Sequence, residues 1–250
     1  MNMKRSTYYV LAVSVMALAA IIGTNTSTLS KALPRQEKQL VNKTQALQIS
    51  TTTTEVRGLP QIDVKLINKS KKGIVACGFV IGSQGQTMVM DGALGATDIV
   101  APQGIESTKL LLSEKGFVPE LSAIIFEDGR GEGDTKAIAY LKDVHRGVKE
   151  QFNQSLQIIK TEQVNSSLPL SVRLQNLQEK LSVLPEQQSG LISSRGLDSG
   201  LTKAKQFLVQ QIQELNEEMR KGNDTDIDTN LNRMISSIEK ALRKLEKEEL

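Results

Sequence analysis

The sequence contains no tryptophan, one cysteine and one histidine, and these shortages limit the chemistry that the chain can support. A single cysteine, Cys77, excludes an internal disulfide, and its apolar surroundings predict a small buried side chain. A structural zinc site normally takes four nitrogen or sulfur ligands, for which this composition leaves little. A Ser-His-Asp triad would depend on His145 alone. We therefore assign no catalytic, cofactor-binding or metal-ligating residue, and we expect no cofactor.

Aromatic residues are also scarce, at 3% of the chain, and neither sign of charge prevails. Ligand pockets are usually lined by rings, so this composition favours pairing of helices over a deep pocket. The 31 Lys and Arg residues and the 28 Asp and Glu residues are interspersed and leave a net charge of +3. The chain therefore has no basic stripe of the kind that binds phosphate backbones, and we expect no nucleic-acid partner.

One long hydrophobic run is present, and it lies near the N-terminus. Lys4 and Arg5 precede an apolar stretch over residues 8–22, which is the layout of a secretory signal. The stretch is shorter than the roughly 20 residues that span a membrane comfortably. No small-x-small cleavage site follows directly. The sequence thus predicts export, with residues 1–23 as a signal peptide or an N-terminal membrane anchor and no other contact with the membrane.

The next part of the chain reads as a linker followed by short strands. Residues 24–54 are rich in Thr, Ser, Asn and Gln and predict an exposed linker. Ile62, Val64 and Leu66 then alternate with polar residues, which indicates a strand with one apolar face. Further strands are expected at residues 74–81, 87–90, 107–112 and 121–126. Residues 55–134 therefore predict a small antiparallel β-sandwich of immunoglobulin-like type.

Two polar segments of this region carry a resemblance to known proteins. The first is Asn68–Lys72 followed by Ile74, and the second is Phe126–Gly129 followed by Glu132–Asp134. In these segments the chain resembles small exported bacterial β-sandwich proteins of unknown function, over residues 55–150. The resemblance implies a secreted or envelope location and the sandwich fold. It implies no activity and no catalytic residue.

The acidic loop over residues 127–134 has oxygen ligands and glycine turns that would suit calcium. Arg130, in its middle, would repel a cation. Asp134 also stands where the N-cap of a following helix is expected. We therefore favour a turn and a helix cap over a metal site.

A second acidic segment resembles the first half of an EF-hand loop, with oxygen donors at alternate positions from Asp224 to Asn232. Thr229 stands where such a loop needs glycine, and Ile235 where it needs glutamate. Thr225 and Asp228 instead have the spacing of a capping box. We expect a helix to begin at residue 226, which excludes ion binding.

Residues 135–250 predict amphipathic helices. Apolar residues three or four apart run from Ile138 to Ile159, weakened at Gly147 by about 1 kcal/mol relative to alanine. His145 lies on this stripe, where a lone histidine is more often packed than functional. Three narrower seams follow, formed by Leu170, Leu174, Leu177, Leu181 and Leu184, by Leu201, Ala204, Leu208, Ile212, Leu215 and Met219, and by Ile227, Leu231, Met234, Ile238, Ala241 and Leu245.

Connections between these helices set their expected pairing. Residues 186–199 read as a loop, and the short link at residues 221–225 favours an antiparallel hairpin of the last two helices. Seams this narrow need partner helices, from this chain or from a second copy.

The sequence thus predicts an α+β protein with an export helix, an immunoglobulin-like sandwich and C-terminal helices that form a hairpin or coiled coil over residues 135–250. We interpret it as an exported, non-enzymatic protein that acts through protein–protein contact in the cell envelope, with self-association through the helical seams left open. The alternative is an envelope domain that binds a glycan or small ligand, or an unrecognised hydrolase. Periplasmic, secreted and membrane-anchored locations all fit.

Overall fold

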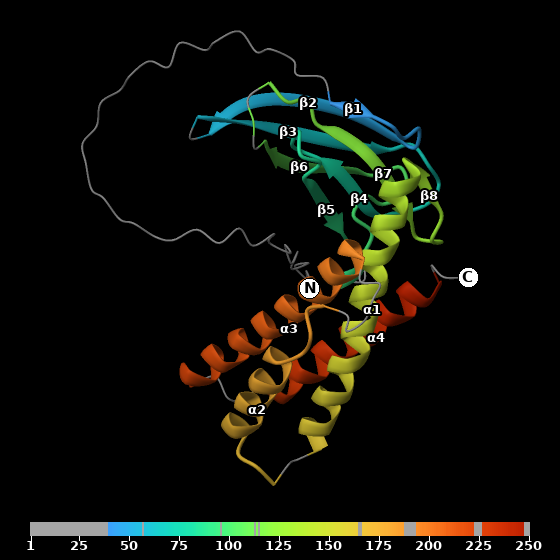
Figure 1. Cartoon of the computed structure of the whole chain (residues 1–250). Helices are drawn as coiled ribbons and strands as arrows, with labels where there is room; N and C mark the ends of the chain where they lie inside the picture. The colour runs from blue at the N-terminus through green and yellow to red at the C-terminus, as the bar shows by residue number, and fades with distance from the viewer. Residues whose placement is uncertain are drawn as a thin grey trace, which may run out of the picture. The chain divides into compact units, whose positions relative to one another are not determined.

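The computed structural model describes residues 40–56, 58–95, 97–112, 114, 116–164, 167–187, 194–222 and 227–247. The expected export segment, residues 1–23, lies outside the described residues. Within the described part of the chain, no helix is both long enough and apolar enough to cross a membrane. Residues Gln36–Leu250 form one compact unit, in which two sheets precede four helices (Figure 1). This confirms the α+β class.

The first sheet has five strands. They are β1 (Val41–Asn42), β7 (Glu120–Phe126), β4 (Ile74–Val80) and β5 (Thr87–Asp91) in spatial order, with β8 (Gly131–Gly133) paired to β7. The pair β1–β7 is parallel and the other pairs are antiparallel. The strands predicted from the apolar runs at 74–81 and 121–126 form its centre, as expected for segments buried on both faces.

The second sheet has three strands, in the order β2 (Leu47–Val56), β3 (Leu59–Asn68) and β6 (Ile105–Leu111), all antiparallel. Strand β2 corrects the linker prediction for residues 47–54. Its run of threonines at 51–54 is polar, which suggested a linker, but threonine is β-branched and suits the pleated surface of a strand at a sheet edge. The polar composition of this segment therefore predicted a linker where the structure has a strand.

The two sheets share one cluster of buried residues. Ile62, Val64 and Leu66 of β3 are at most 1% exposed, which confirms the predicted alternation. They pack in the same cluster as Phe79 of β4 and Ile124 of β7. The inner faces of both sheets thus form a common core.

The opposite face of the five-stranded sheet packs against the first helix, α1 (Thr135–Val164), through Val75, Ala123, Ile125 and Leu141. The carboxylate of Asp134 caps this helix, because its Oδ1 accepts hydrogen bonds from the backbone N–H groups of Lys136 and Ala137, each at 3.0 Å. The N-cap prediction is confirmed. Asp134 marks the change from strands to helices along the sequence. Helix α1 packs against the five-stranded sheet and also contributes to the core of the helices.

The remaining helices are α2 (Leu170–Ser182), α3 (Arg195–Arg220) and α4 (Ile227–Lys247). All four helices contribute to one buried cluster, which contains Leu174, Leu177, Leu181, Leu208, Ile212, Leu231, Ile238 and Leu245. The seams are therefore buried within a single chain. Helix α3 ends at the predicted link over residues 221–225, with Gly222 at a φ of 82° just after the C-cap residue Lys221.

Helix α4 lies antiparallel to α1 rather than forming a simple hairpin with α3. Lys160 pairs with Glu239 at 2.7 Å, and the Gln163 amide donates to Asn232 at 2.6 Å. Because residue numbers rise along α1 as they fall along α4, the two helices run in opposite directions. The expected hairpin of the last two helices is thus replaced by a pairing through α1.

Helix α3 begins earlier than the sequence predicted, since residues 195–199 were expected in a loop. Ser194 caps it by accepting a hydrogen bond from Leu197 N at 3.1 Å. Two glycines of α3, which would weaken a helix in isolation, lie against α1: Gly200 contacts it at Gly147, and Gly196 contacts it at Tyr140 and Asp143. A Cβ on Gly200 would lie 2.9 Å from both Gly147 Cα and Val148 N, closer than real Cβ atoms come. These glycines allow the two backbones to touch.

Candidate functional site

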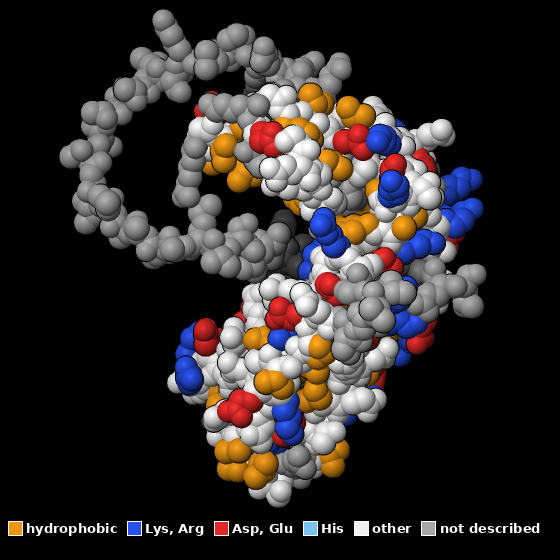
Figure 2. Space-filling view, viewed as in Figure 1, with side chains coloured by type: hydrophobic (Ala, Val, Ile, Leu, Met, Phe, Trp, Pro, Cys, Tyr) orange, Lys and Arg blue, Asp and Glu red, His pale blue; other side chains and the backbone are white. Residues whose placement is uncertain are grey.

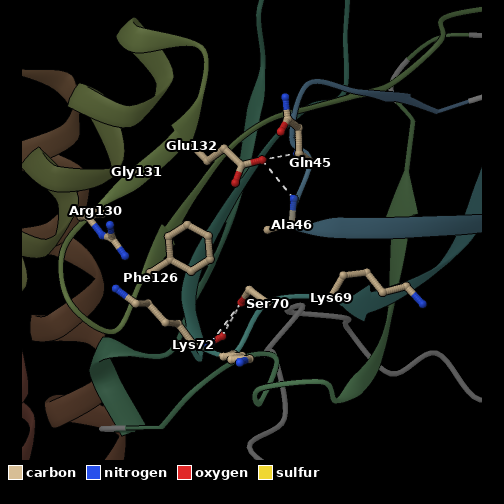
Figure 3. A pocket seen from close by; sticks show the side chains of 10 residues that line it. Gln45, Ala46, Lys69, Ser70, Lys72, Phe126, Arg130, Gly131 and Glu132 are labelled. Carbon is tan, nitrogen blue, oxygen red and sulfur yellow. Dashed lines mark hydrogen bonds between the residues drawn. The ribbon is translucent and has the colours of Figure 1, made fainter.

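A hollow of about 570 Å³ lies at one end of the β strands. Four chain segments line it: residues 45–46 before β2, residues 69–72 after β3, Phe126 at the end of β7, and residues 130–132 at the start of β8. Figure 3 shows the Phe126 ring in the middle of the site, with Arg130 and Lys72 on one side and Gln45 and Glu132 on the other.

Four cationic side chains surround this hollow: Lys69, Lys71, Lys72 and Arg130. Asp128 pairs with Lys72 Nζ and, at 3.0 Å, with Arg130 Nε. The hydrogen bond from Lys72 is the main cause that holds the pKa of Asp128 below its usual value. Lys69 and Lys71 have no carboxylate partner among the described residues, so the site keeps an excess of positive charge.

The loop that carries the lysines is fixed by a buried asparagine. Asn68 is 1% exposed, and its amide donates to the carbonyl oxygens of Lys72 at 2.7 Å and Ala101 at 3.0 Å. Its Oδ1 accepts from the backbone N–H of Ser70 at 2.9 Å. The Asn68 side chain thus holds the backbone of residues 70–72 through its donors and its acceptor. The backbone that carries the lysines is therefore fixed in position.

The opposite wall is held by Glu132, whose Oε1 accepts hydrogen bonds from the backbone N–H groups of Gln45 and Ala46, the latter at 3.0 Å. Between the walls, Phe126 N–H donates to the carbonyl of Arg130 at 2.9 Å and closes the turn before β8. Gly129 supplies the left-handed residue of this turn, with a φ of 77°. The hollow is thus a preformed site with an aromatic ring and a basic rim.

The acidic segments considered as calcium sites are used in other ways. Asp128 is engaged by two cations and Glu132 by two backbone N–H groups, as described above. Asp228 lies in the first turn of α4 and accepts from Arg173 Nη2 at 3.1 Å. Within the described residues, no group of three or more His, Cys, Asp and Glu side chains could hold a metal ion. Residues 224–226 lie outside the described part of the chain.

His145 lies away from this hollow, on α1, where its Nε2 is 3.1 Å from Asp91 Oδ1 at the end of β5. Both side chains are at most 6% exposed, which confirms that His145 is packed. Burial alone would raise the pKa of Asp91, but the charge and hydrogen bond of His145, an N–H from Ala93 and the charge of Lys203 together hold it below its usual value. Burial in turn lowers the pKa of Lys203.

An imidazole beside a carboxylate could in principle transfer protons. Here the pair is enclosed between β5 and α1, so a substrate has no access to either group. We interpret Asp91 and His145 as a joint between the five-stranded sheet and the helices. The pairing of Asp91 with His145 was not predicted, because nothing in the sequence places the two residues opposite each other.

The hollow itself was not predicted, because its residues come from four separate segments. The one available signal was the lysine-rich segment 69–72, a polar segment between two expected strands, which by itself indicates no binding site. Comparison of the chain with protein-family models, curated proteins and solved structures finds no match. The arrangement of residues in this chain must therefore carry any functional conclusion.

Proposed function

We propose that this chain is an exported, non-enzymatic binding protein of the cell envelope, which holds an acidic segment of a partner protein in the basic hollow. The observation that carries the proposal is a pair of exposed lysines, Lys69 and Lys71, which have no carboxylate partner among the described residues and lie beside the half-buried ring of Phe126. Asp or Glu side chains of a partner would form ion pairs with these two lysines. An apolar side chain of the partner would cover Phe126.

The expected strength of such a contact is modest and depends on salt. Exposed ion pairs contribute about 0.2–1 kcal/mol each, so the lysines alone give specificity and a faster encounter more than tight binding. Burial of apolar surface on Phe126 would supply the larger share. In the view of Figure 2, Lys and Arg side chains gather along one side of the β region, which would steer an acidic partner towards it.

Two structural features direct the proposal to the strands rather than the helices. The helical seams pack against one another inside the chain, so they are not open to a second copy. His145 is enclosed, so a hydrolase built on the only histidine of the sequence gains no support. The common core of the two sheets supports a sandwich of immunoglobulin-like type, which belongs to this proposal together with the resemblance to exported β-sandwich proteins.

A second candidate function is the binding of an anionic glycan or small ligand in the same hollow. Its volume of about 570 Å³ favours this alternative, since ligand pockets occupy roughly 300–1,000 Å³. The two candidates share the same basic rim, and only the choice of ligand separates them.

Binding can be tested with a fluorescent oligoglutamate peptide, a neutral oligoglutamine peptide and an acidic oligosaccharide such as oligogalacturonate. We expect the full chain to bind the oligoglutamate probe more tightly than the neutral one, and binding to weaken as salt rises. The double variant Lys69→Glu and Lys71→Glu should weaken it about tenfold. Lys65→Glu and Lys136→Glu together make the same change of charge at exposed positions that do not line the hollow, and they should not weaken binding.

Each outcome decides between the candidates. Equal loss in both double variants would show a general charge effect and would contradict the site. Binding of oligogalacturonate alone, abolished by the hollow variants, would favour the glycan over the acidic protein segment.

Export rests on Lys4, Arg5 and the apolar run over residues 8–22. Residues 1–40 fused to a reporter that is active only outside the cytosol should give a signal. Replacing Val13 and Leu18 with arginine should abolish the signal, because charge within the run is costly to insert. Alanine at the same two positions is the matched control. A signal indifferent to arginine would refute export through this segment.

A further inference from the structure

Strand β6 forms an open edge of the three-stranded sheet. Within the described residues it pairs only with β3, while β2 lies at the opposite edge (Figure 1). Exposed sheet edges present unpaired backbone groups that can bind another strand, and proteins usually protect them. Strand β6 is seven residues long and carries two large hydrophobic side chains that remain exposed, Ile105 at 58% and Leu111 at 50%.

The backbone direction of β6 follows from the two hydrogen bonds that flank it. Leu112 N–H donates to Pro60 O, and Asn68 N–H donates to Gly104 O, both at 3.0 Å. Residues 104 and 112 therefore point towards β3, and so does every second residue between them. The backbone groups of Ile105, Ser107, Lys109 and Leu111 consequently face the open edge. Among the described residues, the Ser107 N–H donates a hydrogen bond only to the neighbouring Glu106 carboxylate, at 3.1 Å, which a competing strand could displace.

Side chains alternate in the same way. Ile105, Ser107, Lys109 and Leu111 share the outer face of the sheet, while Thr108 and Leu110 lie on the inner face opposite Val64 and Ile62 of β3. In Figure 2, hydrophobic side chains are visible on the upper surface, over the region of β2 and β3. A partner strand must therefore cover one apolar residue near each end of β6.

We propose that β6 pairs antiparallel with β6 of a second copy, about a two-fold axis at Thr108. In this register Ile105 lies opposite Leu111 of the second copy, and Leu111 opposite its Ile105, so each exposed hydrophobic residue is covered by one from the other copy. Ser107 lies opposite Lys109 of the second copy, which avoids direct opposition of like charges. Thr108 lies opposite its own counterpart.

The backbone agrees with this register. An antiparallel pair alternates residues that exchange two hydrogen bonds with residues that exchange none. The residues whose N–H and C=O groups face the edge are 105, 107, 109 and 111, and this register pairs them only with one another. Thr108, whose groups point to β3, falls in the non-bonded central pair. About eight backbone hydrogen bonds would form across the interface.

The charges on the outer face also allow the pairing. Each Lys109 has Asp63 of β3 beside it in the same sheet, so the two Lys109 residues do not meet as unbalanced charges. The interface joins two three-stranded sheets into one continuous sheet of six strands. It uses neither the hollow nor the helical seams, so it can succeed or fail independently of the proposed function.

The register can be tested by cysteine cross-linking of the full chain. A non-bonded antiparallel pair has a Cα–Cα distance of about 4.5 Å, which a disulfide can span. Thr108→Cys should therefore give a disulfide-linked dimer under mild oxidation. Lys109→Cys is the matched control, since diagonal neighbours are about 7–8 Å apart and should link poorly. The native Cys77 is buried and does not compete.

The strength of the pairing can be tested by light scattering of the full chain over a range of concentrations. Ser107→Pro removes a donor that faces the edge and leaves the β3 ladder intact, whereas Ser107→Ala retains that donor. We expect a concentration-dependent dimer whose dissociation constant rises about tenfold or more in Ser107→Pro and in Leu111→Lys, but not in Ser107→Ala. A wild-type chain that stays monomeric, or equal linking through residues 108 and 109, would overturn the proposal.

Discussion

The crossing of α1 and α3 gives the sharpest prediction, because two physical effects there have opposite signs. Replacing glycine by alanine inside a helix normally stabilises it by about 1 kcal/mol. At Gly200 the new Cβ would lie 2.9 Å from Val148 N and from Gly147 Cα, and it would overlap the carbonyl oxygen of Val144. Backbone atoms cannot rotate away as a flexible side chain can. The two helices would have to move apart.

Overpacking a well-filled interior costs about 1–3 kcal/mol, and contact with backbone belongs at the upper end of that range. After subtraction of the gain in helix propensity, Gly200→Ala should lower the free energy of unfolding by about 2 kcal/mol. For a unit of this size, the melting temperature should fall by about 4–8 °C. Ser199→Ala, one residue away and half-exposed, gains propensity without the clash and should not destabilise the protein.

The assay is urea or thermal unfolding followed by far-ultraviolet circular dichroism. Gly147→Ala should behave like Gly200→Ala, because its Cβ would lie 2.9 Å from Leu201 N and 3.0 Å from Gly200 Cα. The double variant should lose less than the sum of the two, since one separation of the helices accommodates both methyl groups. A Gly200→Ala variant at least as stable as wild type would refute the close crossing.

Three further predictions concern the helical core, the cap of α1 and the joint at Asp91. Ile238→Asp, at a buried seam position, should lower the free energy of unfolding by about 3 kcal/mol or more, whereas Ser237→Asp on the exposed face should change it by less than about 0.5 kcal/mol; similar losses at both sites would contradict the seam. Asp134→Ala should cost about 1 kcal/mol in urea unfolding through loss of the N-cap, while Asp134→Asn should retain most of it. The pKa of Asp91 is held below its unfolded value despite burial, so this carboxylate stabilises the fold above about pH 4, and that contribution is lost as the pH falls through the lower folded pKa. The stability difference between wild type and Asp91→Asn should therefore shrink on acidification, and a difference that is constant with pH would contradict the ionised pair.

Sequence patterns predicted those elements whose packing is determined locally. The strand at Ile62–Leu66 alternates because one face is buried, and the helix after Asp134 combines a cap with a long apolar stripe. The threonines of β2 led to the wrong prediction of a linker, because a β-branched polar residue fits both a linker and an edge strand. Gly131 and Gly133 in β8 concealed a strand for a similar reason, since glycine usually weakens one.

Contacts between distant segments were not predictable from one sequence. Gly147 was interpreted as a weak point of its helix, and Gly196 as part of a loop. Each interpretation follows the ordinary preference of glycine, which is overridden here because Gly147 lies against Gly200 of α3, and Gly196 lies against Tyr140 and Asp143 of α1. A helix with glycine at the crossing loses intrinsic helix propensity, which the sequence shows, but gains close contact with the partner helix, which only the fold shows.

The loop after β5 shows how the helices support the strands that carry the proposed binding surfaces. Asp91 at its start pairs with His145 of α1, and Asp98 further along pairs with Lys244 of α4 at 2.7 Å. One short segment of the β region is thus tied by charge to two helices that are far apart in the sequence. Because α1 also covers the five-stranded sheet, loosening the helices should weaken the sheet that places Phe126 and β8 in the hollow. The helical half therefore acts as the scaffold, while the open faces of the protein lie on the strands.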